Sequence, residues 1–287
     1  MTKQTEAALA HLSLGKVTAY ADQYDASLLQ PVPRQLARDA IGLPADAALP
    51  FVGHDVWHGY ELSWLNSKGK PMVALLTVTV PFDSDNLIES KSFKLYLNSL
   101  NQHCFADFAT VKTCLQHDLS QVLGTGLQVR LVQPCEITSN KKMAPIEELG
   151  GQLLDRLDIE VNSHQSADLL LLKADHTSAP ITQTLVSHLL KSNCPVTGQP
   201  DWASVQIQYQ GRPIDEEGLL RYLIGFRQLG EFHEHCVEKI FCDIKIQCQP
   251  EKLSVYARYT RRGGLDINPF RTDFNAAWPN NIRHARQ

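Results

Sequence analysis

Alternation of hydrophobic and polar residues predicts strands in both halves of the chain. Residues 54–65 and 71–82 are rich in β-branched and aromatic side chains, with an Asn- and Gly-containing segment between them, which predicts a β-hairpin. Residues 127–132 alternate with a period of two and predict a further strand. The segments 204–209 and 253–259 alternate in the same manner and predict strands in the second half.

Between these strands, hydrophobic residues recur with the spacing of an amphipathic helix. Phe93, Tyr96 and Leu97 are followed by Leu100, which completes the i, i+3, i+4, i+7 pattern of one helical face. Similar spacing predicts helices over residues 108–122, 219–229 and 232–244. The first half is therefore predicted to follow the order strand, strand, helix, helix, strand.

A similar order of elements recurs in the second half in nearly the same register. Tyr96-Leu97 aligns with Tyr222-Leu223, 126 positions later (222 − 96), and two further short matches keep this spacing to within one position. Self-similarity at a fixed spacing indicates a repeated unit. We predict two α+β modules, an N-terminal one with a leading segment over residues 1–145 and a C-terminal one over residues 146–287.

Composition and charge describe an ordinary globular chain of 287 residues, 43% of them hydrophobic and 20% charged. The net charge of −4 argues against a protein that binds nucleic acid mainly by neutralising phosphates. No apolar run resembles a signal peptide or reaches the roughly 18 residues of a membrane span. Seven cysteines without a CxxC pair favour reduced thiols. We expect a cytoplasmic protein with no membrane partner and no direct nucleic-acid partner.

Cys194 lies in a segment whose pattern predicts a loop. Apolar residues at helical spacing over residues 186–190 predict a helix that ends before this cysteine, and an irregular segment follows it. A thiol in such a loop either packs inside the protein or meets a substrate as a thiolate. Asp201, which follows a proline, is either a turn residue or a proton donor close to that sulfur.

Polar residues also gather where two helices are expected to begin. Glu89, Ser90 and Lys91 precede the helix of the first half, and His233 and Glu234 open the last helix. Ser and Glu are common near helix starts, so a capping role is one interpretation. The pair in the second half is alternatively a base-recognition pair or a metal pair. A catalytic zinc is not expected, because neither HExxH nor a Cys/His quartet is present.

The segment Arg258-Tyr-Thr-Arg-Arg-Gly-Gly264 places three arginines and two glycines at the end of the last predicted strand. Such a segment suits a phosphate-binding loop as well as an ordinary basic loop. No GxGxxG motif follows a strand, so a nicotinamide cofactor, if one is used, would not be held by a Rossmann fold.

Several segments together resemble the nitrile reductases of the queuosine pathway (QueF) in their long, two-module form. They are spread from one end of the chain to the other and comprise Leu14-Gly-Lys16, Tyr24–Leu29, Tyr60–Asn66, Leu87–Asn98, Cys194–Trp202, Glu231–Glu234 and Arg261–Pro269. The resemblance does not extend to residues 136–180. Because the matching segments are many and dispersed, the resemblance does not depend on any single motif.

The resemblance implies both a fold and a reaction. The fold is a tandem tunnelling fold (T-fold), in which each module is an antiparallel sheet backed by two helices and modules close into a barrel on assembly, with a homodimer expected. The reaction is the NADPH-dependent reduction of 7-cyano-7-deazaguanine to 7-aminomethyl-7-deazaguanine, without a metal. By the same resemblance, Cys194 is the nucleophile that forms a thioimide and Asp201 is the acid that protonates the nitrile nitrogen.

The resemblance also implies binding residues in both halves. Substrate contacts are expected from Ile88, Glu89, Ser90, His233 and Glu234, and NADPH contacts are expected from Ser90, Lys91, Arg262 and Gly263. The site is therefore expected at an interface between halves, of one chain or of neighbouring subunits. Two other functions stay open: a cyclohydrolase-like hydrolase, which would need a metal, and a non-catalytic protein that binds a purine or pterin.

Overall fold

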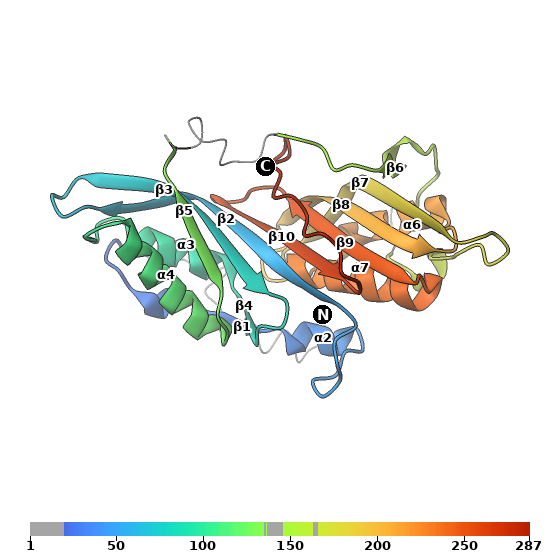
Figure 1. Ribbon diagram of the computed structural model, residues 1–287, viewed down its shortest axis with the longest axis horizontal. Helices are drawn as coiled ribbons and strands as arrows, with labels where there is room; N and C mark the ends of the chain where they lie inside the picture. The colour runs from blue at the N-terminus through green and yellow to red at the C-terminus, as the bar shows by residue number, and fades with distance from the viewer. Residues whose placement is uncertain (1–19, 135, 137–145, 163–165) are drawn as a thin grey trace. The chain divides into compact units, whose positions relative to one another are not determined.

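The computed structural model describes residues 20–134, 136, 146–162 and 166–287 (Figure 1). The chain divides into two compact units. The first takes its residues from Met1–Ala45, His54–Ala144 and Arg261–Ile267, and the second takes its residues from Asp46–Gly53, Pro145–Thr260 and Asn268–Gln287. Each unit thus includes a short segment from the opposite half of the chain. The matching segment at residues 14–16 lies outside the described residues.

Three antiparallel strands form a sheet in the first unit, in the order β5-β3-β2. β2 (Val52–Leu65) and β3 (Pro71–Pro81) form the predicted hairpin, and β5 (Gln128–Val132) pairs with β3. The side chain of Asn66 accepts hydrogen bonds from two backbone N–H groups of the turn, and Gly69 has a φ of +73°. These two residues account for the tight turn, and the hairpin prediction is confirmed.

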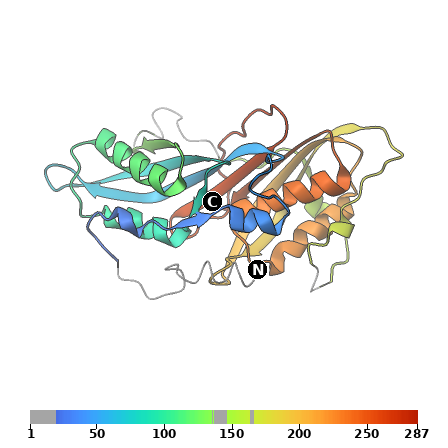
Figure 2. The ribbon, with the colours of Figure 1, turned by 90° about the horizontal axis from the view of Figure 1, so that it is seen from below.

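Two helices, α3 (Ser90–Ser99) and α4 (Phe108–Leu123), lie on one face of this sheet, as Figure 1 and Figure 2 both show. The carboxylate of Glu89 caps the start of α3, and that of Asp107 caps the start of α4. Gly124 ends α4 in the left-handed conformation that glycine adopts without strain. The two helices predicted from hydrophobic spacing are therefore confirmed, each with its own capping residue.

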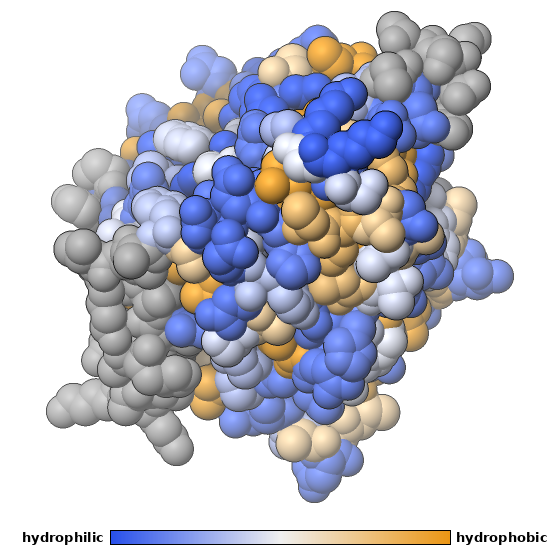
Figure 3. All heavy atoms as spheres, turned by 90° about the vertical axis from the view of Figure 1, so that its left-hand side faces the viewer, coloured by the Kyte–Doolittle hydropathy of each residue, from blue (hydrophilic) through white to orange (hydrophobic). Residues whose placement is uncertain are grey.

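The core of the first unit lies between the sheet and these two helices. It includes the fully buried Leu62, Leu76, Tyr96, Val111, Leu115 and Leu119. Truncating any one of these leucines to alanine would cost about 2–5 kcal/mol of stability. On the surface shown in Figure 3, hydrophilic side chains cover most of the area and hydrophobic ones form smaller patches.

A second, two-stranded sheet lies beside the start of α3. β1 (Pro31–Pro33) pairs antiparallel with β4 (Asn86–Ile88), and Pro31 lies opposite Ile88. A 3-10 helix, η1 (Ala26–Leu28), precedes β1, and the short α2 (Gln35–Ala40) follows it. This pairing fixes the position of Ile88 and therefore of the first turn of α3.

The second unit contains the same kind of antiparallel sheet, in the order β10-β9-β8-β7-β6. Its strands are β7 (Ile181–Asn193), β8 (Pro200–Gly211), β9 (Lys252–Tyr259) and β10 (Leu265–Thr272), the first three residues of β10 belonging to the first unit. The short edge strand β6 (Gln152–Leu153) departs from this pattern, because it runs parallel to β7.

Two helices, α6 (Glu216–Ile224) and α7 (His233–Cys248), cover one face of this sheet (Figure 1). The 3-10 helix η4 (Gly225–Gln228) continues α6, and η2 (Leu154–Arg156) follows β6. Both predicted helices are confirmed. No helix in the described part of the chain is long and apolar enough to cross a membrane.

The helix predicted over residues 186–190 is wrong, because this segment belongs to β7. The register of β7 against β8 shifts between Ser187 and Leu190, which marks a β-bulge. A bulge inserts residues into one strand and breaks the alternation of sides. Hydrophobic residues that would alternate in a regular strand therefore acquire a spacing close to that of a helix.

Two other segments differ from what their sequence suggests. β10 was not predicted, since it contains Pro269 and follows a Gly-Gly pair, yet it pairs antiparallel with β9. Leu169–Leu171, three consecutive leucines, forms the 3-10 helix η3. The side chain of Asp168 accepts a hydrogen bond from the N–H of Leu170, which favours the helical turn.

The two units share details that support an internal duplication. In the first, the hydroxyl of Tyr96 donates to Asp118 of the following helix (2.6 Å). In the second, the hydroxyl of Tyr222 donates to Asp243 of the following helix (2.5 Å). The leading hairpin of each unit also carries a register shift, between Gly59 and Leu62 in one case and within β7 in the other. The two units therefore share an order of elements, a buried Tyr–Asp bond and a bulge.

Candidate active site

Cys194 begins the loop between β7 and β8, and it is only 5% exposed. Its backbone N–H donates to the carbonyl of Gln199 (2.8 Å), and its carbonyl accepts from the N–H of Gly198 (3.0 Å). Gly198 has a φ of +68°, which suits glycine. The loop is therefore closed by its own hydrogen bonds and holds the thiol in a defined place.

The loop is also fastened to the segment that leads into α7. The N–H of Asn193 donates to the carbonyl of Leu229 (2.8 Å), and the N–H of Glu231 donates to the carbonyl of Asn193 (3.0 Å). These two bonds bring the end of β7 next to the start of α7. As a result, residues far apart in the sequence, Cys194 and His233, belong to one neighbourhood within the second unit.

Asp201 lies at the same end of the β7–β8 hairpin as Cys194. It is the second residue of β8, pairs across the strands with Ser192, and is 6% exposed. Cys194 follows Ser192 by two positions, so the loop that holds the thiol begins next to the strand end that holds Asp201. The structure thus corrects the expectation of a helix before Cys194 while retaining the irregular loop, and Asp201 belongs to a strand.

His233, the first residue of α7, connects this carboxylate to a buried aromatic ring. Its Nε2 is 3.3 Å from Oδ2 of Asp201. Its ring stacks on Tyr259, with ring centroids 3.9 Å apart and planes inclined by 14°. Its Nδ1 is buried without a hydrogen-bond partner among the described residues. Glu234, the next residue, is also buried, so both residues of the predicted pair face the protein interior.

Burial controls the protonation of the groups beneath this site. It raises the pKa of the Cys236 thiol to about 12, with a further contribution from the negative charge of Glu231. It also raises the pKa of Tyr259 well above its usual value, helped by the nearby Cys236. Both groups are therefore neutral at physiological pH. Cys236 is in consequence a poor nucleophile there, since the thiolate is the reactive form.

In the first unit, Glu89 is fully buried and acts as the cap of α3. Its two carboxylate oxygens accept hydrogen bonds from the N–H groups of Lys91 (2.6 Å) and Ser92 (2.8 Å). Burial raises the pKa of Glu89, while these bonds and the charges of Lys94 and Lys91 oppose the shift. A carboxylate offers about four lone pairs, so it can accept further donors while it caps the helix.

Arg262 and Gly263 form a tight turn between β9 and β10. The N–H of Arg262 donates to the carbonyl of Leu265 (2.9 Å), and the two central residues, Gly263 and Gly264, have φ of +58° and +78°. Positive φ at both central positions is typical of a type I′ hairpin turn, for which Gly-Gly is a favoured pair. The motif that suggested a phosphate-binding loop is thus a β-turn within the first unit.

Lys94 of α3 lies directly against this turn. A Cβ at Gly263 would come within 3.0 Å of its Nζ. The turn and the lysine border a cavity of about 300 Å³, which Glu61 and Asn98 also line. Arg261, the residue before the turn, is a second cation. Its guanidinium carbon lies 4.6 Å from the centre of the Tyr60 ring. The glycines therefore leave room for backbone and cations to approach an anion closely.

The predicted site residues thus fall into two groups, one in each unit. Cys194, Asp201, His233 and Glu234 lie together in the second unit, and Ile88, Glu89, Ser90, Lys91, Arg262 and Gly263 lie in the first. Sequence reasoning missed Lys94, although it stands three residues after Lys91 on the same helix, and it missed Tyr259. Only the helical spacing of the two lysines is a signal that could have drawn attention to Lys94.

Comparison with known proteins identifies two matching family models. Residues 20–131 match the family described as "Nitrile reductase, 7-cyano-7-deazaguanine-reductase N-term". Residues 200–277 match the family described as "QueF-like protein". The two matches occupy the first and the second half of the chain respectively, as expected for the two-module form. A solved structure, the archaeosine synthase QueF-Like in the apo form, is 15% identical over 35% of this chain and 98% of its own, with a TM-score of 0.30.

Full-length relatives are much more similar. The NADPH-dependent 7-cyano-7-deazaguanine reductases of Ralstonia nicotianae and Cupriavidus necator are each 60% identical to this chain over 277 residues, which cover 96% of this chain and 98% of theirs. The enzyme of the same name from Burkholderia mallei is 56% identical over the same length and coverage. The resemblance found in the sequence is confirmed, and the chain belongs to the family of NADPH-dependent 7-cyano-7-deazaguanine reductases.

Proposed function

We propose that this chain reduces the nitrile of 7-cyano-7-deazaguanine to a primary amine through a covalent thioimide on Cys194. Its relatives at 60% identity are NADPH-dependent 7-cyano-7-deazaguanine reductases, and the chain is accordingly an NADPH-dependent oxidoreductase. One arrangement carries the thioimide proposal. Cys194 and Asp201 are both buried at the same end of the β7–β8 hairpin, and His233 lies 3.3 Å from that carboxylate.

The first step joins the substrate to the protein. The thiolate of Cys194 adds to the nitrile carbon and forms a C–S bond, while the nitrile nitrogen takes up a proton, which gives the thioimide. Asp201 donates that proton, because it is a buried carboxyl at the end of the hairpin where the Cys194 loop begins. His233, whose Nε2 lies 3.3 Å from the carboxyl, holds it in place and can return a proton to it.

The remaining steps convert the thioimide to the amine. NADPH, when bound, supplies one hydride to the thioimide carbon and a second to the imine carbon, so two cofactors are used for each amine. Between these reductions the C–S bond breaks, the nitrogen lone pair forms the imine, and the thiolate of Cys194 is regenerated. The burial of Cys194 and Asp201 limits the access of water, which would otherwise hydrolyse the thioimide or the imine.

Recognition of the deazaguanine ring requires acceptors opposite its ring N–H and amino groups. The buried carboxylates of Glu234 and Glu89 are suited to this role, since an ionised carboxylate is an acceptor only. The unpartnered Nδ1 of His233 is a further polar contact available to the substrate. Ile88 and Ser90 adjoin Glu89 at the start of α3 and complete the proposed substrate set.

The Gly-Gly turn suits the phosphate groups of NADPH. Ser90 and Lys91 at the start of α3, with Arg262 and Gly263 in the turn, are the proposed contacts, and we add Lys94, whose ammonium group lies against Gly263. The space that a Cβ at Gly263 would fill supports this assignment, because a phosphate must approach the backbone closely. The cations then neutralise the phosphate charge.

We also propose the finer features of the fold and setting: a tunnelling fold that closes into a barrel on dimerisation, and a cytoplasmic location. Antiparallel strands backed by two helices in each unit support the fold. Light scattering of the purified chain measures its mass in solution, and a monomer at every concentration would refute the dimer.

Intact-mass measurement tests the covalent step. The full chain is incubated with 7-cyano-7-deazaguanine in the absence of NADPH, and the mass of the protein is expected to increase by that of one substrate. Cys194→Ala is expected to show no adduct and no turnover. Cys104→Ala, which removes an exposed thiol, is the matched control and keeps both. An adduct that persists in Cys194→Ala, or none on the unmodified chain, would overturn the proposal.

A further inference from the structure

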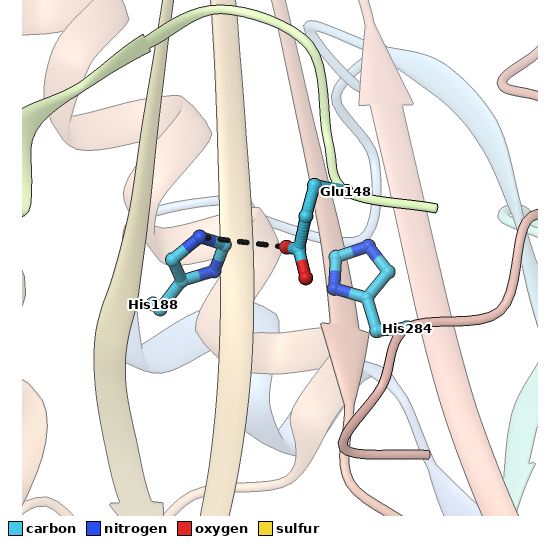
Figure 4. A group of neighbouring side chains, drawn as sticks. All are labelled: Glu148, His188 and His284. Atoms are coloured by element: carbon cyan, nitrogen blue, oxygen red, sulfur yellow. Dashed lines mark ion pairs between the residues drawn. The ribbon is translucent and has the colours of Figure 1, made fainter. Parts of the chain in front are cut away.

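Three potential metal ligands converge in the second unit, outside the groups assigned to the reaction. Glu148 precedes β6, His188 belongs to β7, and His284 lies in the C-terminal segment (Figure 4). One ligand atom from each lies within 4.8 Å of the others. Nε2 of His188 is 3.6 Å from Oε2 of Glu148. His188 and Cys194 are separated by six residues of an extended strand, roughly 20 Å.

Hydrogen bonds determine which nitrogen of His188 faces the cluster. Its Nδ1 is 2.8 Å from the hydroxyl oxygen of Ser204 on the neighbouring strand, which leaves Nε2 directed at Glu148. The guanidinium of Arg286 donates to the same Ser204 oxygen (3.0 Å). The backbone N–H of His188 donates to Asp155 (2.9 Å). Outer partners of this kind orient metal-binding histidines in known sites.

His284 presents a buried imidazole to the cluster. It is 3% exposed, and its Nε2 has no hydrogen-bond partner among the described residues. A buried polar atom without a partner calls for a ligand such as an ion or water.

We propose that Glu148, His188 and His284 bind a divalent transition metal ion of the zinc type. Two histidines and one carboxylate, with water in the fourth position, are a donor set that zinc accepts. Bonds of 2.0–2.1 Å in tetrahedral geometry place ligand atoms roughly 3.3 Å apart, close to the 3.6 Å between His188 and Glu148. Glu148, whose side chain is 64% exposed, is able to close the remaining distance.

The charges around the three ligands determine how strongly the ion binds, and the position of the site determines what the ion stabilises. Arg258 and Arg286 oppose a cation, but each is held by other groups: Arg258 by Gln287 and Asn281, and Arg286 by Ser204 and the backbone of β7. The site is therefore weaker than a closed structural zinc site of four thiolates. By joining the C-terminal segment to β7, the ion stabilises that segment and takes no part in the reduction.

Metal retention by the full chain tests this site. After equilibration with Zn²⁺ and gel filtration, elemental analysis is expected to find one zinc per chain in the unmodified protein. Glu148→Gln, His188→Gln and His284→Gln are each expected to weaken binding by about tenfold or more, since even outer partners of a ligand contribute 10- to 100-fold. His176→Gln, at an exposed histidine of the same unit, is the matched control.

The melting temperature and the visible spectrum with Co²⁺ distinguish metal binding at this site from metal binding elsewhere on the protein. Zn²⁺ is expected to raise the melting temperature of the unmodified protein and of His176→Gln, but not that of His284→Gln. Co²⁺ is expected to give a tetrahedral visible spectrum without a thiolate charge-transfer band. No retained zinc, equal retention by Glu148→Gln and the unmodified protein, or a thiolate band would overturn the proposal. Glu148→Gln keeps this test valid if the histidine variants do not fold, because its side chain is on the surface.

Discussion

Replacing Gly263 by alanine would test two consequences of glycine in this turn: the absence of backbone strain and the room left for Lys94. Its φ of +58° is strained for a residue with a side chain, and the added Cβ would lie 2.9 Å from Cε and 3.0 Å from Nζ of Lys94. Gly69 in the β2–β3 turn is a matched comparison, since its φ is +73° but its Cβ would meet nothing within 4 Å. Gly263→Ala therefore strains the backbone and displaces a lysine, whereas Gly69→Ala only strains the backbone.

Backbone strain and the displacement of Lys94 have different free-energy costs. Left-handed backbone costs a residue with a Cβ about 1–2 kcal/mol, which both variants should lose in stability. To reach ordinary contact distance, the Lys94 side chain must move by roughly 0.5–1 Å. At an effective dielectric constant of 20, unit charges attract by about 4.1 kcal/mol at 4 Å and by about 3.3 kcal/mol at 5 Å. The loss of about 0.8 kcal/mol corresponds to about a fourfold weaker interaction with a phosphate.

Steady-state kinetics measures the effect of displacing Lys94 on NADPH binding, and thermal unfolding measures the backbone strain. Gly263→Ala is expected to raise KM for NADPH about fourfold with little change in KM for the nitrile, while Gly69→Ala leaves both constants unchanged. Both variants should lower the melting temperature by similar amounts. If Gly263→Ala and Gly69→Ala had the same KM for NADPH, the assignment of the turn and Lys94 to the cofactor would be wrong.

Three further predictions concern recognition, stability and thiol reactivity. Glu234→Gln should weaken substrate binding with the fold intact, because a carboxylate oxygen becomes a donor; unchanged affinity in a titration would remove it from the recognition set. Tyr222→Phe should lower the free energy of unfolding by about 1–3 kcal/mol in a denaturant titration, because Asp243 loses a buried hydrogen bond; a neutral effect would contradict this. An alkylating agent at pH 8 should label the exposed Cys104 but not Cys236, whose pKa of about 12 leaves almost no thiolate; rapid labelling of both would refute that pKa.

Local signals predicted most of the elements. The hairpin of β2 and β3 follows from alternation on both sides of a turn with Asn66 and Gly69, and α4 follows from regular helical spacing between Asp107 and Gly124. Hydrophobic spacing gave a wrong prediction for β7, because its bulge changes the spacing of hydrophobic residues without changing their number. β10 escaped prediction because its pairing with β9, and not its own pattern, makes it a strand.

Some residues of the proposed site were likewise predictable from local patterns, and others were not. The loop position of Cys194 and the helix start at His233 were visible as local patterns, and the family resemblance turned them into a nucleophile and a substrate contact. Tyr259 has no such pattern, and Lys94 has only its helical spacing from Lys91. Their roles arise from a ring stacked at 3.9 Å and from a turn without a Cβ, and both depend on a neighbour that lies elsewhere in the chain.

By itself, the sequence determined the α+β class, the repeated order of elements, the family, and with it the reaction and the cofactor. It did so because periodicity is a local property and because many short segments match one family. Only the tertiary structure decided the strand identity of residues 181–193, the contact of Asp201 with His233, and the convergence of Glu148, His188 and His284. Strand register and long-range packing create these contacts, and neither is encoded in the spacing of nearby residues.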